Sequence, residues 1–565
     1  MRSKILRTCG GLPRVIVKLG ETLSQKDATV EEWTKVLEQF NKDREPWSEA
    51  LDEINKYMPL YLRRCLFYFG LFPKGFDIPV RRLIALWVAE GLGRKDNTDE
   101  LPEKVSESCL EELVNKNMVQ VTKRKLNGKT QTCRLPNAFQ EHWLAKAKEA
   151  NFLQGHSCET RIRRVADHLE SNDSIFDHIH GNDRPSSSSL YSSYRDVISL
   201  LSFDTRNNGK PGEEIGDFLD VCISQKCFQD LRVLDLEHVS EPKLSKAIAE
   251  LARLRYLGLR WTKLKKLPSF ISKLLNLQTL DLKHTTIDTL PSSIWMMQQL
   301  RHLYLDEFNR CRFVPRPRNS SMTNLQTLWG LVVDEESPVV DGLDTLIKLR
   351  KLGLRCQMMS FKEEAVLSQL EAVGNWVQKL GHLECLRLKW YDRLNPWELP
   401  LKSLSGHSSL TSIYLVGELK NKSILSQLPQ SLIEITLSTS ALAEDPMQIL
   451  NQLPKLKFLR LLSKSYAGNT MICSPGGFPE LRVLKLWELE SLEEWTVEEG
   501  AMPLLKHLEI KACQNLRMLP NGVQQITTLR IFKLSKMPRE FTDRIKDDQH
   551  PEHHKIVHVS YVSMD

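Results

Sequence analysis

Leucines recur in a fixed pattern over most of the chain. The motif L-x-x-L-x-L returns every 23 residues in LRVLDL, LRYLGL, LQTLDL and LRHLYL, which begin at residues 231, 254, 277 and 300. Further copies begin at residues 349, 383, 410, 432, 456, 481, 505 and 529, a degenerate copy begins at 325, and ISLLSF opens the array at 198–203. The alternation x-L-x-L indicates a short half-buried strand. One repeat cannot bury its leucines alone, so the pattern predicts stacked repeats.

We expect residues 194–565 to form an α/β solenoid, a leucine-rich-repeat horseshoe with a C-terminal cap. Each fully buried leucine contributes roughly 1.5–3 kcal/mol, so a long stack stabilises itself. The interval between copies grows to 34 residues between 349 and 383, and such insertions usually lie on one rim or face. The final KIVHVSYV alternates as a cap strand does. Near it, His550, His553 and His554 could bind a metal ion, but we expect a solvated turn and no metal site.

The N-terminal third shows helical periodicity followed by a hairpin signal. Apolar spacing near 3.6 predicts helices over 11–20, 31–40 and 51–69, and another in VRRLIALWVAEGL at 80–92. The segments MVQVTKRKL and KTQTCRL then alternate around Asn127-Gly128, which favours a β-hairpin. Helices that lead into a two-stranded ribbon indicate a winged helix. We assign it to residues 57–150, after an α-helical segment over 1–56.

The hairpin contains Gly128-Lys129-Thr130, which looks like the end of a phosphate-binding loop. Such a loop needs G-x-x-x-x-G-K-[ST] between a buried strand and a helix, because several glycines let backbone N–H groups converge on phosphate. Here Lys123 stands where the first glycine is needed, so we expect a hairpin tip instead. After it, Pro136 ends the strand, and Asn137 with Gln140 predicts a capping box for the next helix.

Residues 151–193 read as a linker between the winged helix and the repeats. RIRRVADHLESNDSIFDHI, at 161–179, predicts a helix. GNDRPSSSSLYSS, at 181–193, is a Ser-rich break.

With these elements in this order, the chain resembles plant nucleotide-binding leucine-rich-repeat disease-resistance proteins of the coiled-coil class. GLPRVIVKLG at 11–20 is similar to the GLP motif of that family. RRCLFYFGLFPKGFDIPVRRLIALWVAEGL at 63–92 is similar to its winged-helix signature, and LEELVNKNMVQ at 110–120 to the helix and strand that follow. The resemblance implies that 1–56 is the C-terminal part of the helical subdomain of the nucleotide-binding (NB-ARC) module and 57–150 its winged-helix subdomain. It also implies an N-terminally truncated member, because the family's phosphate loop precedes the GLP motif.

The resemblance also locates the nucleotide contacts of the family. Its Met-His-Asp switch motif, whose His senses bound ADP, aligns with Leu135, Pro136 and Asn137, so Pro136 replaces the sensing His. Of the other nucleotide contacts, Pro13 in the GLP motif alone has a counterpart here. We therefore expect no cofactor in this chain, although full-length members of the family bind ADP or ATP.

The function implied by the resemblance is that of an innate immune receptor fragment. Its repeats would recognise a pathogen effector or a guarded host protein and regulate the NB-ARC switch through an intramolecular contact, with oligomers only at full length. The expected location is the cytoplasm, with the nucleus as the alternative. Two other functions stay open: a winged-helix DNA-binding protein and a leucine-rich-repeat adaptor scaffold. No Ser-His-Asp, paired-carboxylate or metal-ligand pattern emerges, so we expect no enzyme.

Composition adds few constraints. The net charge is +7, with 41% hydrophobic and 26% charged residues, which is ordinary for a soluble protein. The twelve cysteines are scattered without a C-x-x-C pair, so we expect reduced core thiols. No secretory signal and no run of roughly 18 apolar residues occurs, so we expect no membrane span.

The polar positions of the predicted strands are candidates for partner binding. Early repeats mix Asp235, Glu237 and Asp281 with basic residues, and later repeats combine basic and aromatic residues, which is typical of interface hot spots. The candidates are Arg260, Trp261, Arg355, Arg387, Lys389, Trp390, Arg460, Lys485, Trp487 and Lys511. Ordinary solvated strand residues are an equal alternative. Nucleic acid is a weaker one, because no reading helix is evident. Charge reversal at Arg387, Lys389 and Lys485 should weaken partner binding and leave thermal stability unchanged.

Overall fold

The computed structural model divides the chain into two compact units. One unit comprises residues 1–264 and 270–281, and the other comprises 265–269 and 282–565. The structure describes residues 5, 13–42, 45–93, 100–125, 127–153, 162–168, 179–180, 193–207, 209–309, 311–318, 320, 322–357, 363–390, 399, 401–419 and 423–565. The predicted boundaries at 56, 150 and 193 follow sequence modules, whereas the compact units divide the chain within the repeats.

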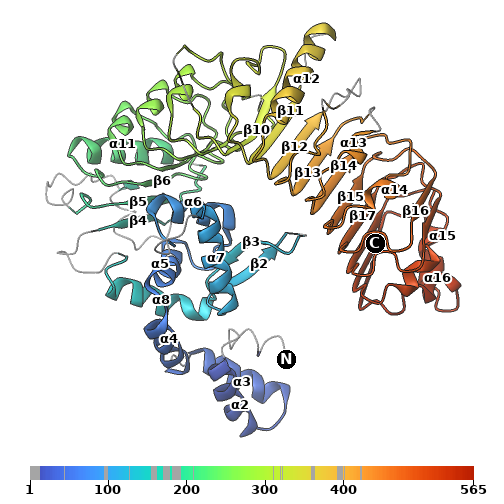
Figure 1. Ribbon diagram of the computed structural model, residues 1–565. Helices are drawn as coiled ribbons and strands as arrows, with labels where there is room; N and C mark the ends of the chain where they lie inside the picture. The colour runs from blue at the N-terminus through green and yellow to red at the C-terminus, as the bar shows by residue number, and fades with distance from the viewer. Residues whose placement is uncertain are drawn as a thin grey trace. The chain divides into compact units, whose positions relative to one another are not determined.

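The first unit begins with helices and continues into a small antiparallel sheet (Figure 1). Its helices up to the linker are α2 Pro13–Ser24, α3 Val30–Lys42, α4 Glu45–Tyr57, α5 Leu60–Phe67, the 3-10 helix η1 Tyr68–Leu71, α6 Val80–Glu90, α7 Pro102–Asn115 and α8 Asn137–Glu149. Strands β1 Ile78–Pro79, β2 Gln120–Arg124 and β3 Thr130–Arg134 form a sheet in the order β1-β3-β2. Helices followed by this ribbon have the organisation of a winged helix.

Aromatic side chains fill the core of the winged helix. The rings of Phe69 and Trp87 meet edge to face with centroids 6.1 Å apart, and those of Phe67 and Trp143 lie 6.3 Å apart. The helix predicted over 51–69 is interrupted, because Pro59 separates α4 from α5 and cannot donate a helical hydrogen bond. Pro59 is instead the N-cap residue of α5.

The hairpin prediction is confirmed, and the capping prediction is wrong. Strands β2 and β3 pair antiparallel, and Gly128 adopts a left-handed φ of 78° in the turn between them. The GKT sequence is therefore a hairpin tip. Helix α8 begins at Asn137, and its N-cap is Pro136, with no side-chain hydrogen bond to the helix. Asn137 is already helical, so its side chain is one position too late to cap.

The first repeats complete the first unit, with strands β4 Arg164–Asp167, β5 Ser199–Ser202, β6 Val233–Asp235, β7 Tyr256–Gly258 and β8 Thr279–Asp281. All pair in parallel and in chain order. The helices among them are α11 Pro211–Ser224 and the 3-10 helices η2 Lys246–Glu250 and η3 Ser269–Lys273. The helix predicted over 161–179 is wrong for Arg164–Asp167, which form β4. All four residues of β4 are buried. Its charged residues, Arg164 and Asp167, are three positions apart, which is also the spacing of polar residues on one face of an amphipathic helix, and this spacing explains the wrong prediction.

One hydrophobic core joins the winged helix to these strands. It extends from Trp87 and Phe72 to Leu201 of β5, Phe203 just after that strand, and Val233 of β6. The rings of Phe72 and Phe203 meet edge to face with centroids 5.6 Å apart. The winged helix and the first repeats therefore fold as one body.

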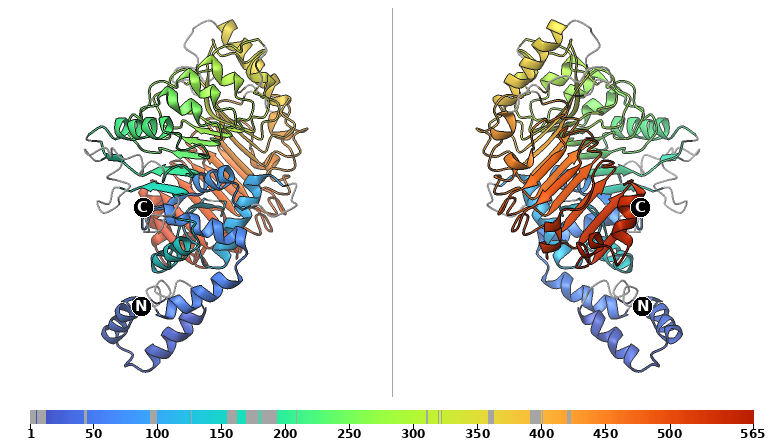
Figure 2. Two further views of the ribbon diagram at one scale, coloured as in Figure 1. Left: turned by 90° about the vertical axis from the view of Figure 1, so that its left-hand side faces the viewer. Right: turned by 90° about the vertical axis from the view of Figure 1, so that its right-hand side faces the viewer.

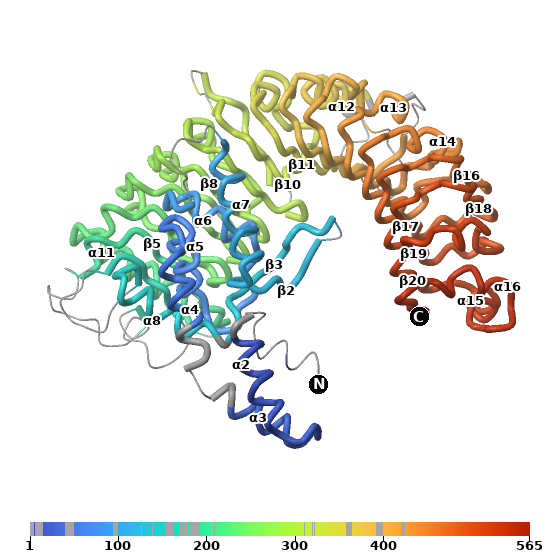
Figure 3. The backbone as a smooth tube through the Cα atoms, turned by 60° about the horizontal axis from the view of Figure 1, so that its bottom comes forward, coloured from blue at the N-terminus to red at the C-terminus, as the bar shows by residue number. Residues whose placement is uncertain are grey.

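The second unit continues the repeats with parallel strands (Figures 2 and 3). They are β9 His302–Tyr304, β10 Thr327–Val333, β11 Lys351–Cys356, β12 Cys385–Trp390, β13 Ser412–Val416, β14 Glu434–Ser438, β15 Phe458–Leu462, β17 Val483–Trp487, β19 His507–Lys511, β20 Ile531–Ser535 and β21 Tyr561–Met564. Strands β16 Thr470–Cys473 and β18 Glu494–Val497 form a separate parallel pair. The remaining helices are α12 Glu363–Gln378, α13 Ser423–Ser426, α14 Met447–Leu450, α15 Arg539–Lys546, α16 Pro551–His554 and the 3-10 helices η4 Ser292–Met296, η5 Leu343–Thr345 and η6 Asn521–Gln525.

The leucines of the repeat motif point into the stack, as predicted. Leu386 and Leu388 of β12 are fully buried, and Arg387 between them is half-exposed. Helix α12 occupies the 34-residue interval, which confirms that the extra residues form an insertion outside the strands. The chain ends in β21, paired in parallel with β20.

His550, the described cysteines and the described helices have structural roles. His550 caps α16 by accepting a hydrogen bond from the Glu552 N–H at 3.1 Å. The described cysteines have free thiols, and all except Cys385 are buried. Within the described ranges, no helix has both the length and the apolar character to cross a membrane.

Candidate functional site

Helix α6 carries charged residues at the ends where a helix tolerates them least. Arg81 and Arg82 lie in its first turn, which is the positive end of the helix dipole, and Glu90 lies in its last turn, the negative end. Gly91 terminates the helix in a left-handed conformation with φ of 82°. Local helix stability does not favour these charges. Their partners lie on the repeat strands of the same unit, and these contacts account for their positions.

Arg82 is the most buried charged group of this set, with 1% of its surface exposed. Its Nε lies 2.7 Å from Oδ2 of Asp235, on β6, and 3.4 Å from Oε2 of Glu237. Its guanidinium also lies over the rings of Phe72 and Phe203, at 5.7 and 5.3 Å from their centroids. Burial disfavours the charged guanidinium, but the two carboxylates outweigh it and raise the pKa of Arg82.

Arg81 extends the same contact to further strands. Its Nη2 lies 3.0 Å from Oε1 of Glu237, and its Nη1 lies 3.0 Å from Oδ2 of Asp281, at the end of β8. Arg260 contacts the same oxygen of Asp281 at 3.1 Å. Burial raises the pKa of Glu237, but Arg82 and Arg81 outweigh burial and lower it. We call Arg81, Arg82, Asp235, Glu237 and Asp281 the arginine clasp.

The opposite end of α6 is held by a second buried ion pair. Nη2 of Arg164, on β4, lies 2.6 Å from Oε2 of Glu90, and the hydroxyl of Ser199 donates to the other carboxylate oxygen. The Arg164 guanidinium lies 3.6 Å from the ring centroid of Phe152 and donates to the Phe152 carbonyl at 2.9 Å. Both ends of α6 are thus fixed to the repeat sheet by charges of opposite sign.

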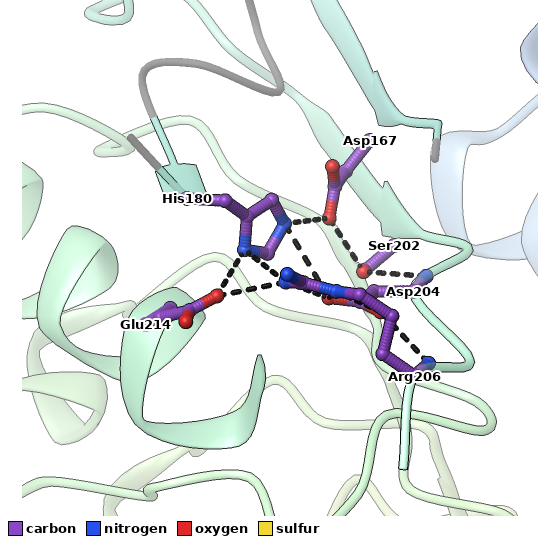
Figure 4. Close-up of polar contacts among 6 residues, drawn as sticks. All are labelled: Asp167, His180, Ser202, Asp204, Arg206 and Glu214. Carbon is purple, nitrogen blue, oxygen red and sulfur yellow. Dashed lines mark hydrogen bonds and ion pairs between the residues drawn. The ribbon is translucent and has the colours of Figure 1, made fainter. Parts of the chain in front are cut away.

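A histidine network lies beside β4 (Figure 4). Nε2 of His180 lies 3.0 Å from Oδ2 of Asp167, and Nδ1 lies 2.7 Å from Oε2 of Glu214 on α11. The Ser202 hydroxyl donates to Asp167 at 2.7 Å. Burial disfavours the imidazolium, but Asp167, Glu214 and Asp204 outweigh it and raise the pKa of His180.

Arg206 supplies a cation to the same network. Its Nη2 lies 2.6 Å from Asp204, 2.8 Å from Glu214 and 3.0 Å from Nδ1 of His180. A histidine with two carboxylates could hold a cation, and here a guanidinium nitrogen lies among them. The absence of a resident metal stays a prediction.

The predicted partner-binding residues do not form one exposed surface. Trp390 is only 4% exposed because it points into the core at the end of β12, so its prediction as a contact residue is wrong. Arg260 is buried against Asp281. Trp261 is 49% exposed and stacks on His238, with centroids 6.0 Å apart. The half-buried members are Arg355, Arg387, Lys389, Arg460, Trp487 and Lys511.

Lys485 also departs from the prediction. It is only 6% exposed, and its Nζ lies 2.6 Å from Oε2 of Glu509 on the next strand. Burial disfavours the carboxylate, but His507 and Lys485 lower the pKa of Glu509 to about 2. Lys389 and Arg387 likewise contact Glu307, at 2.9 and 3.6 Å. Reversing these charges should therefore lower stability, contrary to the expectation from sequence.

The residues that align with the nucleotide contacts lie in ordinary local structure. Leu135 is buried, Pro136 is half-buried before α8, and Asn137 is exposed at its first position. Pro13 is the first residue of α2, and its side chain lies outside the described part. The sequence analysis missed Arg81 and Arg82. Two adjacent arginines on an apolar helix, together with acidic early repeats, were the available signal.

Two family models match the chain. A model described as a leucine-rich repeat region matches residues 215–543, which is more than half of the chain. A model described as a disease resistance protein winged helix domain matches residues 71–141, which include α6 and the hairpin.

The relatives are plant proteins. "Probable disease resistance RPP8-like protein 2" of Arabidopsis thaliana is 28% identical over 606 residues, covering 100% of this chain and 61% of that protein. "Inactive disease susceptibility protein LOV1" of the same plant is 33% identical over 551 residues, covering 94% of this chain and 57% of that protein. The chain belongs to the plant leucine-rich-repeat disease-resistance proteins. It spans 57–61% of the length of these two relatives.

Among solved structures, a leucine-rich-repeat protein of Leptospira interrogans is similar over 64% of this chain and 84% of its own chain. The identity is 19% and the TM-score is 0.38.

The arginine clasp generates a stability prediction for this disease-resistance protein. Arg82→Gln should lower the free energy of unfolding of the first unit by about 3–5 kcal/mol, because it leaves a buried carboxylate unpaired. Arg81→Gln should cost about 1 kcal/mol or less, because Arg81 is one-third exposed. Urea-induced unfolding monitored by tryptophan fluorescence measures both changes.

A matched control lies on the same winged helix. Lys74 forms an exposed ion pair with Glu141 at 3.7 Å, so Lys74→Gln should leave the urea midpoint within the error of the wild type. Equal midpoints for Arg82→Gln and Lys74→Gln would show that the buried pair contributes nothing to docking.

The histidine network generates a pH prediction. The folded-state pKa of His180 lies above its usual value of 6.5, so its charged hydrogen bonds stabilise the fold fully below about pH 6.5. This contribution is lost as the pH rises through the folded-state pKa. The difference in unfolding free energy between wild type and His180→Gln should therefore be roughly 1.5–3 kcal/mol at pH 6 and shrink toward pH 9. Urea unfolding at several pH values tests this; a difference independent of pH would contradict it.

Proposed function

We propose that this chain is the regulatory and recognition part of a plant intracellular immune receptor. Its repeats recognise a pathogen effector or a guarded host protein, and its winged helix transmits that event to the nucleotide-binding switch. Membership of the disease-resistance family supports this role. The observation that carries it is the buried ion pair between Arg82 of the winged helix and Asp235 of the repeats.

The clasp suits regulation because it couples recognition to the position of α6. A partner that binds the repeats changes the receptor only if it has different affinities for the docked and undocked arrangements. The clasp sets the free energy that such a partner must overcome. The buried ion pair and the shared core make the docked arrangement the resting one.

DNA recognition by the winged helix is a weaker proposal. A recognition helix presents basic side chains to the groove and its phosphates. Here Arg82 is buried against Asp235, and Arg81 contacts Glu237 and Asp281. An adaptor function would need the repeats alone and would not explain the arginine clasp.

A chimera tests the receptor function. The matching region of an Arabidopsis relative is replaced by this chain and expressed in leaves, with defence-associated cell death as the readout. The wild-type chimera should cause no cell death. Arg82→Gln should cause cell death without any pathogen, because α6 is released. Lys74→Gln should stay quiet.

Protein accumulation, measured by immunoblot, separates release from unfolding. Arg82→Lys keeps the charge beside Asp235 and should give a weaker response than Arg82→Gln at equal accumulation. If the Arg82→Gln chimera accumulates normally and the leaves stay healthy, the clasp does not restrain a receptor.

We also propose that this chain alone holds no adenine nucleotide. Pro136 offers no imidazole where the family has its ADP-sensing His, and it occupies the N-cap position of α8 without a side-chain hydrogen bond. Isothermal titration of the chain with ADP should give no binding isotherm up to millimolar concentration. A micromolar affinity would overturn the proposal, and its loss in a Pro13→Ala variant would locate the site.

A further inference from the structure

Aligned residues run across the polar face of the repeat strands in the second unit, and all except Gly353 carry a side chain. Strand pairing aligns one residue from each of eight neighbouring strands at the same level. In order from β11 to β20 they are Gly353, Arg387, Tyr414, Thr436, Arg460, Lys485, Glu509 and Lys533. Neighbouring strands lie about 4.8 Å apart, so the row forms a continuous strip across the sheet.

Basic residues outnumber acidic residues on this strand face. The strands from β11 to β20 contribute Lys351, Arg355, Arg387, Lys389, Arg460, Lys485, Lys511 and Lys533. The carboxylates are Glu434 and Glu509, together with Glu307 from the segment after β9. Each carboxylate is already engaged: Glu434 contacts Arg460 at 2.6 Å, Glu509 contacts Lys485, and Glu307 contacts Lys389.

Besides Lys351, three surplus cations have no acidic partner among the residues that the structure describes. Arg355 donates to the Glu307 carbonyl at 2.9 Å and lies 5.9 Å from the ring centroid of Phe308. Lys511 lies over the Trp487 ring, 4.8 Å from its centroid. No ion pair is formed by Lys533 within the described ranges. These three side chains can accept a carboxylate without first breaking an ion pair.

The aromatic rings of this face are occupied by cations. Lys485 and Lys511 both lie 4.8 Å from the Trp487 centroid. The Arg387 guanidinium lies 4.9 Å from the Tyr414 centroid and 5.7 Å from that of Trp329. Single-stranded nucleic acid binds by stacking bases on open rings along a uniformly positive groove. Here cations lie over the rings of Trp487, Tyr414 and Trp329, and carboxylates interrupt the strip, which favours a protein partner.

The first unit shows how a charged strand face of this fold is satisfied. There the equivalent strand positions are acidic, at Asp235, Glu237 and Asp281, and a helix with complementary charge covers them. The second unit has the opposite sign of charge, and its cations exceed its carboxylates. The same rule of complementarity therefore calls for an acidic polypeptide.

We propose that the polar face of strands β11–β20 binds an acidic protein segment that includes aromatic residues, with Arg355, Lys511 and Lys533 as its carboxylate contacts. This inference rests on the proposed recognition role and names the chemical class of the partner. The partner's aromatic rings would pack on Phe308, which is 65% exposed, and beside Trp487. Such cationic and aromatic positions are typical of binding hot spots.

Binding of a synthetic copolymer of Glu and Tyr to the full chain tests the proposal. Fluorescence anisotropy compares the wild type with Arg355→Glu/Lys511→Glu/Lys533→Glu. The triple variant should bind at least about tenfold more weakly, because three attractive contacts become repulsive. Its melting temperature should fall only slightly, since none of the three residues has a described ion pair and the losses are one hydrogen bond and two cation–ring contacts.

The control variant changes the same net charge elsewhere. Lys273, Lys455 and Lys546 are exposed and lie outside the strands, so their reversal to Glu should alter copolymer affinity less than about twofold. No copolymer binding by the wild type, or equal loss in both triple variants, would overturn the proposal. Duplex DNA that binds as tightly as the copolymer at equal charge would also overturn it, in favour of a nucleic-acid surface.

The outcome is separable from that of the proposed receptor function. If the chimera signals but the chain does not bind the copolymer, only the acidic-partner inference is contradicted. If the chain binds the copolymer through Arg355, Lys511 and Lys533 but the chimera never signals, only the proposed receptor function is contradicted.

Discussion

A charge buried between two structural modules must be paired, and this constraint organises the first half of the protein. Arg82 is almost completely buried and has Asp235 within hydrogen-bond distance. Separation of α6 from β6 would expose two charged groups to water but would also expose the apolar residues that surround them. Removal of either charge alone leaves the other in a medium of low polarity. The pair therefore specifies which helix docks on which strand, while the apolar core around it supplies the favourable free energy.

The pairing of charges also organises the strands along the repeats. Inward positions carry leucines, and many outward positions carry charged residues that form ion pairs across the sheet. In the first unit the outward charges are acidic and are neutralised by a helix of the winged domain. In the second unit many outward cations contact carboxylates of the same sheet, at Glu307, Glu434 and Glu509. Under the proposed recognition role, the candidate contact residues are therefore the charges left over after internal pairing, not all charges on the strand face.

This distinction explains what the sequence could and could not predict. The leucine period predicts the strands because each repeat packs on its neighbour, and the hairpin follows from Asn127-Gly128 and the alternating segments on either side. These are local signals. The role of Arg82 depends on Asp235, 153 residues away, and only the folded chain brings them together. The prediction that Trp390 contacts a partner was wrong because the residue was grouped with Arg387 and Lys389. It instead continues the buried alternation of Leu386 and Leu388.

Strand β4 shows why the winged helix and the repeats cannot be understood separately. It is the first strand of the sheet within the described residues, and a solenoid needs its terminal strand covered. β4 has charged residues at both ends, Arg164 and Asp167, and both are buried. Side chains alternate along a strand, so Arg164 lies on the face that carries Asp235, and Asp167 lies on the opposite face. Glu90 of the winged helix satisfies Arg164, and His180 with Ser202 satisfies Asp167. The winged helix thus pairs charges at the beginning of the repeats, so any event that releases α6 would also leave Arg164 without its carboxylate partner.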